Sequence, residues 1–255
     1  PKVIISGLLH DVIEDTRFNS EHIREKFGDE ISKIVQSLTK LNTDENNLIK
    51  NLDQKNMRRF LVSMAQDIRV VIIKLADRLH NVETLEYLDV EKRKKIAKET
   101  LSIHAPLAKK IGMNDLKWRL EDESFKHLMP DKFKMTKRLI SQKRGEREVT
   151  TQEMISQIKK QLEISSLDAE VTGRPKSLYS VYTKLQRYKQ LGRNFSDIED
   201  LIAIRVIVNT KENCYSVLGK IHDLWRPMAG SFDDYIASPK ENYYQSIHTV
   251  VMNDS

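Results

Sequence analysis

Cysteine, proline and glycine are scarce in this sequence, and long apolar runs are absent. The single cysteine, Cys214, cannot form a disulfide within the chain, so a disulfide-stabilised fold is excluded and a reducing, cytoplasmic environment is expected. Eight glycines and six prolines in 255 residues predict long helices and few irregular loops. No apolar run approaches a membrane span, and the N-terminus lacks the regions of a signal peptide, so no membrane partner is expected.

Charged residues, in contrast, are abundant. They make up 31% of the chain and hydrophobic residues 39%, a balance typical of a soluble globular protein. The length is sufficient for two domains, each with its own core. The net charge of +6 and the pI of about 9.2 favour partners rich in phosphate, such as nucleotides or RNA, although so modest a charge also fits simple solubility.

Four ionisable side chains follow an apolar run near the N-terminus: His10, Asp11, Glu14 and Asp15. If residues 3–15 form one helix, positions 10 and 14 share a face, as do positions 11 and 15. One imidazole and three carboxylates then crowd together, and the like charges repel unless a cation neutralises them. The pair His10 and Asp11 suits a divalent metal, and Glu14 and Asp15 could orient and deprotonate a metal-bound water. The alternative is an acidic helix end that faces solvent.

A second segment, residues 67–81, carries similar chemistry. Its apolar run predicts a buried helix with Asp77 at the solvent-exposed end and Asn81 on the same face, four residues later. A carboxylate in this position is rarely buried without a partner, and sharing the metal of the first segment would satisfy it. Asn81 could then hydrogen-bond a ligand. The alternative for Asp77 is a surface ion pair with Lys74 or Arg78.

The rest of the first half is predicted to be helical, apart from a polar loop at residues 42–47. We expect His80 and His104 to be structural histidines rather than ligands. The other helices expected from apolar spacing are a short one that ends at Gly28 with Ser20 as its N-cap, then 29–38, 48–66, 90–110 with a break at 105–106, 112–128 and 131–144.

The hydrophobic period changes after residue 163, so the chain as a whole is predicted to be α+β. The expected strands are 167–172, 201–208 in the centre of a sheet, 234–237 and 245–252, with helices at 178–188 and 213–225.

A second cluster of candidate site residues begins between the first strand and the following helix. Arg174 and Lys176 place two cations beside a helix N-terminus, which suits phosphate, although the glycine spacing of a Walker loop is absent. Ser180 and Lys184 lie on the same helix. Asp200 precedes the predicted central strand, a common position for a magnesium-binding carboxylate. A solvated turn is the alternative for the two cations.

Residues 239–248 add a cation, Lys240, together with aromatic side chains and His248. The face of Tyr244 could stack on a base, and His248 lies four residues later on the same side of a strand. Ordinary packing is the alternative for the tyrosines. Two cations that could bind phosphate, a carboxylate and an aromatic side chain that could stack on a base occur within one small domain. Together they nevertheless favour a nucleotide site.

These motifs, in this order, resemble the long Rel/SpoT proteins, the bifunctional (p)ppGpp synthetase/hydrolases of the bacterial stringent response. Residues 10–16 and 74–81 are similar to the metal motifs of the hydrolase. Residues 173–180, 200–205 and 244–249 are similar to the synthetase motifs. The resemblance covers essentially the whole chain.

For the hydrolase half, the resemblance implies an enzyme that removes the 3′-pyrophosphate of (p)ppGpp. Glu14 and Asp15 would activate the water, and Asn81 and Thr84 would contact the nucleotide. The Mn²⁺ ligands implied by the resemblance are His10, Asp11, Asp77 and one further histidine.

For the synthetase half, the resemblance implies transfer of pyrophosphate from Mg²⁺-ATP to the 3′-hydroxyl of GDP or GTP. Asp200 would bind Mg²⁺, Lys240 and His248 would contact acceptor phosphates, and Tyr244 would stack on guanine. Ser180 would also lie at the nucleotide. The cations implied to grip the ATP phosphates are Arg174, Lys176 and Lys184.

The resemblance also predicts the domains. An all-helical HD-type hydrolase domain at 1–128 would precede a nucleotidyltransferase-like synthetase domain with a mixed sheet at 129–255, both truncated. A first metal-binding histidine is expected before Pro1, a second Mg²⁺ carboxylate after Ser255, and ribosome contact in C-terminal domains absent here. The loop 231–234 is acidic where the family usually carries two cations, which bears on acceptor preference.

Two other functions remain compatible with these residues. One is an HD phosphohydrolase acting on a different nucleotide, with a second domain that only binds. The other is a non-catalytic, basic module that binds RNA or the ribosome.

Overall fold

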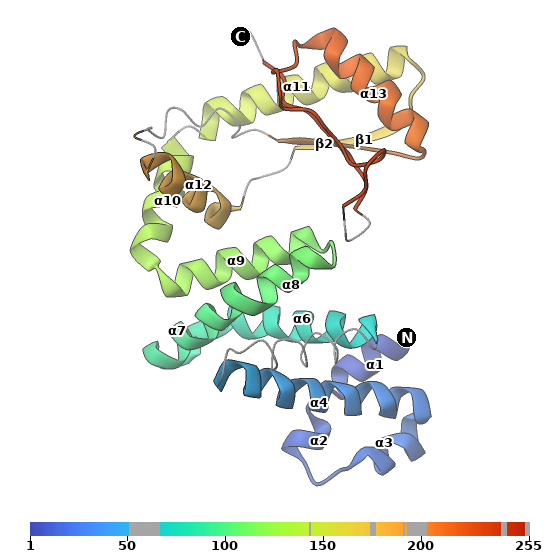
Figure 1. Ribbon diagram of the computed structural model, residues 1–255, viewed down its shortest axis with the longest axis vertical. Helices are drawn as coiled ribbons and strands as arrows, with labels where there is room; N and C mark the ends of the chain where they lie inside the picture. The colour runs from blue at the N-terminus through green and yellow to red at the C-terminus, as the bar shows by residue number, and fades with distance from the viewer. Residues whose placement is uncertain are drawn as a thin grey trace. The chain divides into compact units, whose positions relative to one another are not determined.

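The computed structural model describes residues 1–50, 67–142, 144–173, 177–190, 192, 203–240 and 244–252 (Figure 1). The chain divides into two compact units, residues 1–108 with 115–128 and residues 109–114 with 129–255. None of the helices in the described ranges combines the length and apolarity needed to cross a bilayer.

The first unit is helical throughout its described part. Its elements are α1 (Lys2–Leu8), α2 (Val12–Asp15), α3 (Ser20–Phe27), α4 (Asp29–Lys50), α6 (Ile68–Glu83), the 3₁₀ turn η1 (Leu85–Tyr87), α7 (Val90–Glu99), the π-helix η2 (Thr100–His104), α8 (Ala105–Lys110) and α9 (Asn114–Leu128). Apolar side chains of α4 and α6 form much of the buried interior, including Ile34, Val35, Leu38, Leu41, Val70, Val71, Ile73 and Leu75.

The single helix predicted over residues 3–15 is wrong. The structure contains α1 and α2 with a turn at residues 9–11 between them. In a continuous helix the Gly7 carbonyl would accept from the Asp11 N–H, but here it lies 2.8 Å from His10 Nδ1. The His10 side chain thus competes with the helical backbone and ends α1.

The polar loop predicted at residues 42–47 is also wrong, because α4 continues without a break from Asp29 to Lys50. The continuation has a packing reason: Leu41 and Glu45, four residues apart on one face, are both buried. The helix predicted over 48–66 lies outside the described residues from residue 51 onward.

The break predicted near Pro106 takes the form of a π-helical turn, η2, which joins α7 to α8. Pro106 has no backbone N–H, so an ordinary helical hydrogen bond is lost at this point. The π turn carries the buried His104 toward α4 and α6.

The second unit combines helices with short antiparallel pairs of strands. Its elements are α10 (Pro130–Gln142), α11 (Arg144–Ile164), β1 (Ala169–Gly173), α12 (Leu178–Gln190), β2 (Ile204–Val208), α13 (Lys211–Leu224), β3 (Asp233–Asp234) and β4 (Ile247–His248). The α+β class is confirmed; every pairing within the described part is antiparallel, so the predicted mixed sheet is not seen there.

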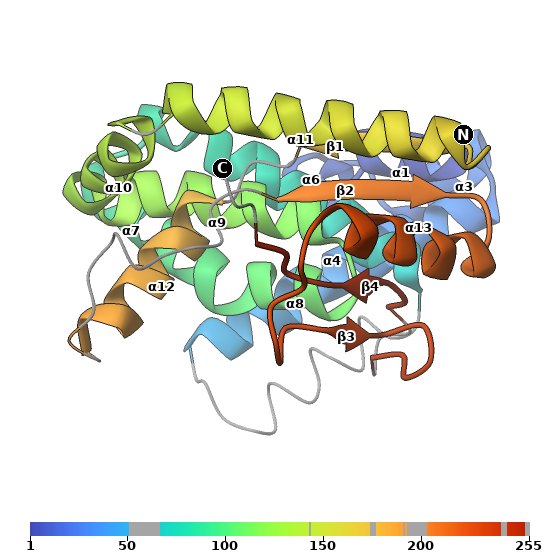
Figure 2. The same ribbon diagram turned by 90° about the horizontal axis from the view of Figure 1, so that it is seen from above.

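β1 and β2 pair from Ala169 opposite Val208 to Gly173 opposite Ile204. The long helix α11 runs beside this pair, as Figure 2 shows. The core beneath the strands is formed by Ile155, Ile158, Leu162, Val171, Val217 and Trp225. The alternation of Val171 inward with Glu170 and Thr172 outward follows the two-residue period of a strand.

The strands predicted at 234–237 and 245–252 are much shorter in the structure. The Asp234 carboxylate accepts hydrogen bonds of 2.9 Å from the backbone N–H groups of Ile236 and Ala237, which turns the chain instead of extending it. Backbone hydrogen bonds from Met228 to Val250 and from Tyr235 to Ser246 still hold the two segments side by side. Residues 201–202 of the predicted central strand lie outside the described residues. Within the described residues, β2 pairs with β1.

Candidate functional site

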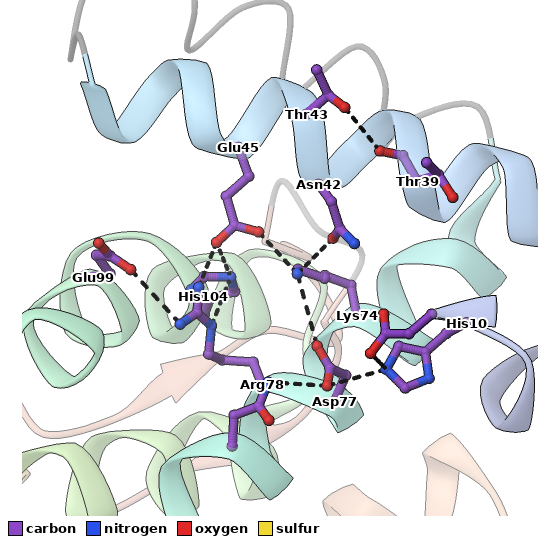
Figure 3. A network of polar contacts seen from close by, with 12 residues as sticks. His10, Thr39, Asn42, Thr43, Glu45, Lys74, Asp77, Arg78, Glu99 and His104 are labelled. Atoms are coloured by element: carbon purple, nitrogen blue, oxygen red, sulfur yellow. Dashed lines mark hydrogen bonds and ion pairs between the residues drawn. The ribbon is translucent and has the colours of Figure 1, made fainter. Parts of the chain in front are cut away.

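Three side chains predicted as metal ligands meet in the first unit. His10 Nε2 lies 2.9 Å from Asp11 Oδ2 and 3.4 Å from Asp77 Oδ1 (Figure 3). His10 and Asp11 come from the turn between α1 and α2, and Asp77 comes from the third turn of α6. The chain therefore brings together residues that are separated by more than sixty positions.

The protonation of His10 follows from its neighbours. The Gly7 carbonyl can only accept, so the ring nitrogen beside it, Nδ1, carries a proton. The other nitrogen, Nε2, then faces two carboxylates. In this tautomer the Nε2 lone pair is the one that can bind a metal ion. The hydrogen bond to the backbone orients the ring as in many metal-binding histidines.

The donor types, one imidazole nitrogen and two carboxylates, suit a divalent metal. Two neighbouring ligand atoms at about 2.1 Å from a metal are about 3.0 Å apart in octahedral geometry and about 3.4 Å apart in tetrahedral geometry. The two nitrogen–oxygen distances at His10 match these values. Within the described ranges, however, no group of three or more His, Cys, Asp or Glu side chains is arranged so that it could hold a metal ion.

Two further predicted residues lie near the end of α6. Asn81 Nδ2 donates to Asp77 Oδ1 at 3.0 Å, so the expected shared face is present, and the Asn81 amide oxygen is the acceptor that faces away from this bond. Thr84 is the C-cap of α6, and its hydroxyl donates to the carbonyls of His80 and Asn81. Both residues follow Asp77 on consecutive turns.

The two predicted water-activating residues are exposed on α2. Glu14 Oε1 accepts a 2.7 Å hydrogen bond from Asn42 Nδ2 on α4. Asn42 in turn accepts from Lys74 on α6 at 2.7 Å. Glu14 is thus tied to two other helices, whereas the structure describes no such contact for Asp15.

A buried ionic network lies next to these residues (Figure 3). Glu45 is its centre: its carboxylate lies 3.1 Å from Lys74, 2.5 Å from Arg78 and 3.1 Å from His104. Glu99 lies 3.8 Å from Arg78. The Glu45 side chain is only 4% exposed, so its charge needs these partners. The alternative pairing of Asp77 with Lys74 is present too, at 3.8 Å, and the pair is part of this network.

The network changes the acidity of its members. Burial alone would raise the pKa of Glu45, but His104, Lys74 and Arg78 outweigh it and hold that pKa well below its usual range. Burial, together with the charge of Arg78, lowers the pKa of His104 to about 4. His104 is therefore neutral at pH 7, and its Nε2 accepts from Arg78 Nε at 3.3 Å.

In the second unit, a group of aromatic side chains surrounds Lys240. The Lys240 ammonium lies 4.0 Å from the centre of the Tyr235 ring and 5.5 Å from that of Tyr244. The Tyr244 hydroxyl and His248 Nε2 are 2.9 Å apart. Lys240, Tyr244 and His248 are therefore brought together, as their predicted role in one site requires. Tyr235, 5.3 Å from the His248 ring, was not singled out by sequence reasoning.

The other predicted synthetase residues are only partly described. Ser180 and Lys184 lie on α12, where the Lys184 ammonium is 5.4 Å from the Tyr188 ring and the Ser180 N–H donates to the Ser177 hydroxyl. Arg174, Lys176 and Asp200 lie outside the described residues.

Asn42, Glu45 and Lys74 were missed as site residues. The first two fell in the segment interpreted as a loop, and Lys74 was considered only as a surface partner of Asp77. The available signal was the helical spacing of Leu38, Leu41 and Glu45, which extends the apolar face of α4 through the polar run.

Comparison with known proteins gives two domain matches. Residues 1–114 match the HD domain, and residues 173–255 match the region found in RelA and SpoT proteins. The first match includes His10, Asp11 and Asp77, and the second includes Lys240, Tyr244 and His248.

Individual relatives align over nearly the whole chain. A GTP pyrophosphokinase of Streptomyces coelicolor is 44% identical over 99% of the chain and 29% of its own length. A guanosine-3′,5′-bis(diphosphate) 3′-pyrophosphohydrolase of Spiroplasma citri is 42% identical over 100% of the chain and 34% of its own length. The bifunctional (p)ppGpp synthase/hydrolase SpoT of Escherichia coli is 40% identical over 97% of the chain and 35% of its own length. The chain spans about a third of the length of these curated relatives.

Proposed function

We propose that this chain, which belongs to the Rel/SpoT family, acts in both directions of (p)ppGpp metabolism. Its first domain, residues 1–128, would hydrolyse the 3′-pyrophosphate of (p)ppGpp, giving GDP or GTP and pyrophosphate. Its second domain, residues 129–255, would transfer pyrophosphate from ATP to the 3′-hydroxyl of GDP or GTP, giving AMP. With these substrates, we expect the enzyme to act in the cytoplasm. The names of its relatives and the two domain matches support this assignment.

The single observation that carries the hydrolase proposal is the approach of Asp11 and Asp77 to the same nitrogen of His10. An HD-type hydrolase implies a divalent metal, and we assign Mn²⁺ to these three residues. When bound, the ion would polarise the pyrophosphate oxygens and increase the acidity of a water molecule.

The chain's own groups would supply the remaining steps of hydrolysis. Glu14 and Asp15 accept the proton of the attacking water, which adds to the phosphorus attached to the 3′-oxygen. Asn81 keeps Asp77 oriented through the 3.0 Å hydrogen bond and offers its amide oxygen to the nucleotide, with Thr84 one turn further. The 3′-oxygen of the nucleotide leaves and takes up a proton, so that pyrophosphate is released.

For the synthetase, the grouping of Lys240, Tyr235, Tyr244 and His248 supports an acceptor site. A tyrosine face can stack on guanine, while Lys240 and His248 contact the acceptor phosphates. We assign the ATP phosphates to Arg174, Lys176 and Lys184, with Ser180 beside the nucleotide. Mg²⁺ is assigned to Asp200.

Identifying the products tests both assignments. The full-length protein is incubated with ppGpp and Mn²⁺, and separately with ATP, GDP and Mg²⁺, and nucleotides are separated by ion exchange. We expect GDP plus pyrophosphate in the first reaction and AMP plus ppGpp in the second. Release of phosphate from other nucleotides without ppGpp hydrolysis would favour a different HD phosphohydrolase. Salt-sensitive RNA binding without either reaction, unchanged in Asp77→Ala, would favour a binding module.

A further inference from the structure

Asn42 on α4 lies between two charged side chains from other helices. Its amide nitrogen donates to Glu14 Oε1 at 2.7 Å. Its amide oxygen accepts from Lys74 Nζ at 2.7 Å, as Figure 3 shows. The opposite amide orientation would place N–H groups against the ammonium and an oxygen against the carboxylate. The charges on both sides therefore select one orientation, in which Glu14 receives a donor.

Lys74 provides a firm anchor for Asn42. Its side chain is 12% exposed, and its ammonium lies 3.1 Å from Glu45 and 3.8 Å from Asp77. Glu45 is in turn held in place by Arg78. The hydrogen bond from Asn42 thus connects Glu14, on an exposed helix of only four residues, to the buried network and to the helix that carries Asp77.

We propose that Asn42 is a positioning residue for hydrolysis: it holds one carboxylate oxygen of Glu14 and leaves the other oriented toward the water. Without this bond, Glu14 would sample several rotamers, since it extends from α2 into solvent. The inference rests on the proposed hydrolase function. In this proposal Asn42 contributes to hydrolysis without contacting the proposed metal ligands or the substrate.

Two substitutions separate this role from a purely structural one. Asn42→Ala removes both hydrogen bonds. Asn42→Asp keeps an acceptor for Lys74 but removes the donor and sets a carboxylate against Glu14. If only the bond to Lys74 matters, the Asp variant retains activity. If donation to Glu14 matters, it is at least as impaired as the Ala variant.

The measurement is steady-state hydrolysis of ppGpp with Mn²⁺ by the full chain. For both Asn42 variants we expect kcat to fall about 10- to 100-fold, the range seen when partners that orient a functional group are removed, with KM and Mn²⁺ affinity unchanged. In a double variant that carries both Glu14→Gln and Asn42→Ala, kcat should be little lower than in Glu14→Gln alone, because the Glu14 carboxylate that Asn42 positions is already altered.

The matched control is Thr43→Ala. Thr43 neighbours Asn42 and is exposed, and its hydroxyl donates to the Thr39 carbonyl of its own helix, so its removal should leave kcat unchanged. Melting temperatures verify that the variants fold. Wild-type kcat in Asn42→Asp, or equal losses in Thr43→Ala, would overturn the assignment. A wild-type chain that releases no pyrophosphate from ppGpp would instead refute the proposed function, and this assignment with it.

Discussion

His104 is a buried residue whose protonation state depends on its neighbours. Neutral Nε2 accepts from Arg78, while protonated Nε2 would donate to Glu45, 3.1 Å away. Complete burial and the charge of Arg78 lower the pKa of His104 from 6.5 to about 4 in the folded chain. Protonation of His104 at low pH therefore places a positive charge in a buried position beside Arg78, which the folded state disfavours.

We expect stability to fall as the pH decreases from 6.5 to about 4. In this range the unfolded chain binds the His104 proton and the folded chain does not, so the free energy of unfolding rises with pH, by roughly 3 kcal/mol across the window. Glu99, whose pKa burial raises, acts in the opposite sense. Urea unfolding at several pH values, compared with His104→Gln, isolates the histidine; an equally steep decrease in that variant would contradict the assignment.

Glu45 is the residue whose loss we expect to be most damaging to stability. Glu45→Gln leaves Lys74 and Arg78, whose side chains are 12% and 10% exposed, without their shared counter-charge. Breaking a buried ion pair costs about 3–5 kcal/mol. Thermal unfolding measures the loss. The matched change Glu91→Gln, at an 87% exposed side chain, should cost under about 1 kcal/mol. Similar losses for both would refute the central role of Glu45.

The proximity of the three candidate metal ligands could be predicted from sequence, but the residues that surround them could not. His10, Asp11 and Asp77 have side chains that suit a metal and stand beside apolar runs, so their chemistry is visible in the sequence itself. Glu45 is an ordinary glutamate in a polar run. Its importance arises from burial against α6 and η2, a tertiary property that no local spacing displays.

At the scale of elements, the first helix shows how a side chain can override periodicity. The apolar spacing of residues 3–15 is helical, yet His10 takes the Gly7 carbonyl and divides the segment. The division turns Asp11 and the ring of His10 toward α6. The strands show the same effect, because Asp234 binds two backbone N–H groups and ends β3 after two residues.

The start of α6, in contrast, follows from local chemistry. Asp67 is the N-cap, and its carboxylate accepts from the Arg69 N–H at 2.9 Å. Asp67→Ala should lower the free energy of unfolding by about 1 kcal/mol, whereas Asp67→Asn, which retains an acceptor, should lower it by less. Equilibrium denaturation of the two variants tests this. Equal losses would show that the ion pair with Arg69 contributes more than the cap does.

At the scale of the whole molecule, the two units have separate cores, one formed by packed helices and the other beneath the β1–β2 pair. The change of hydrophobic period after residue 163 indicated the α+β character of the second half. The short length of β3 could not be predicted, because hydrogen bonds from backbone N–H groups to the Asp234 carboxylate determine where that strand ends.

The central proposal is that His10, Asp11 and Asp77 bind one divalent ion. Calorimetric titration of the full chain with Mn²⁺ measures this directly, with Asp77→Asn as the test and Asp223→Asn, at a 63% exposed side chain in the second unit, as the control. We expect Asp77→Asn to weaken binding at the hydrolase site by at least about 10-fold and the control to bind like the wild type. Unchanged Mn²⁺ affinity in Asp77→Asn would contradict the account.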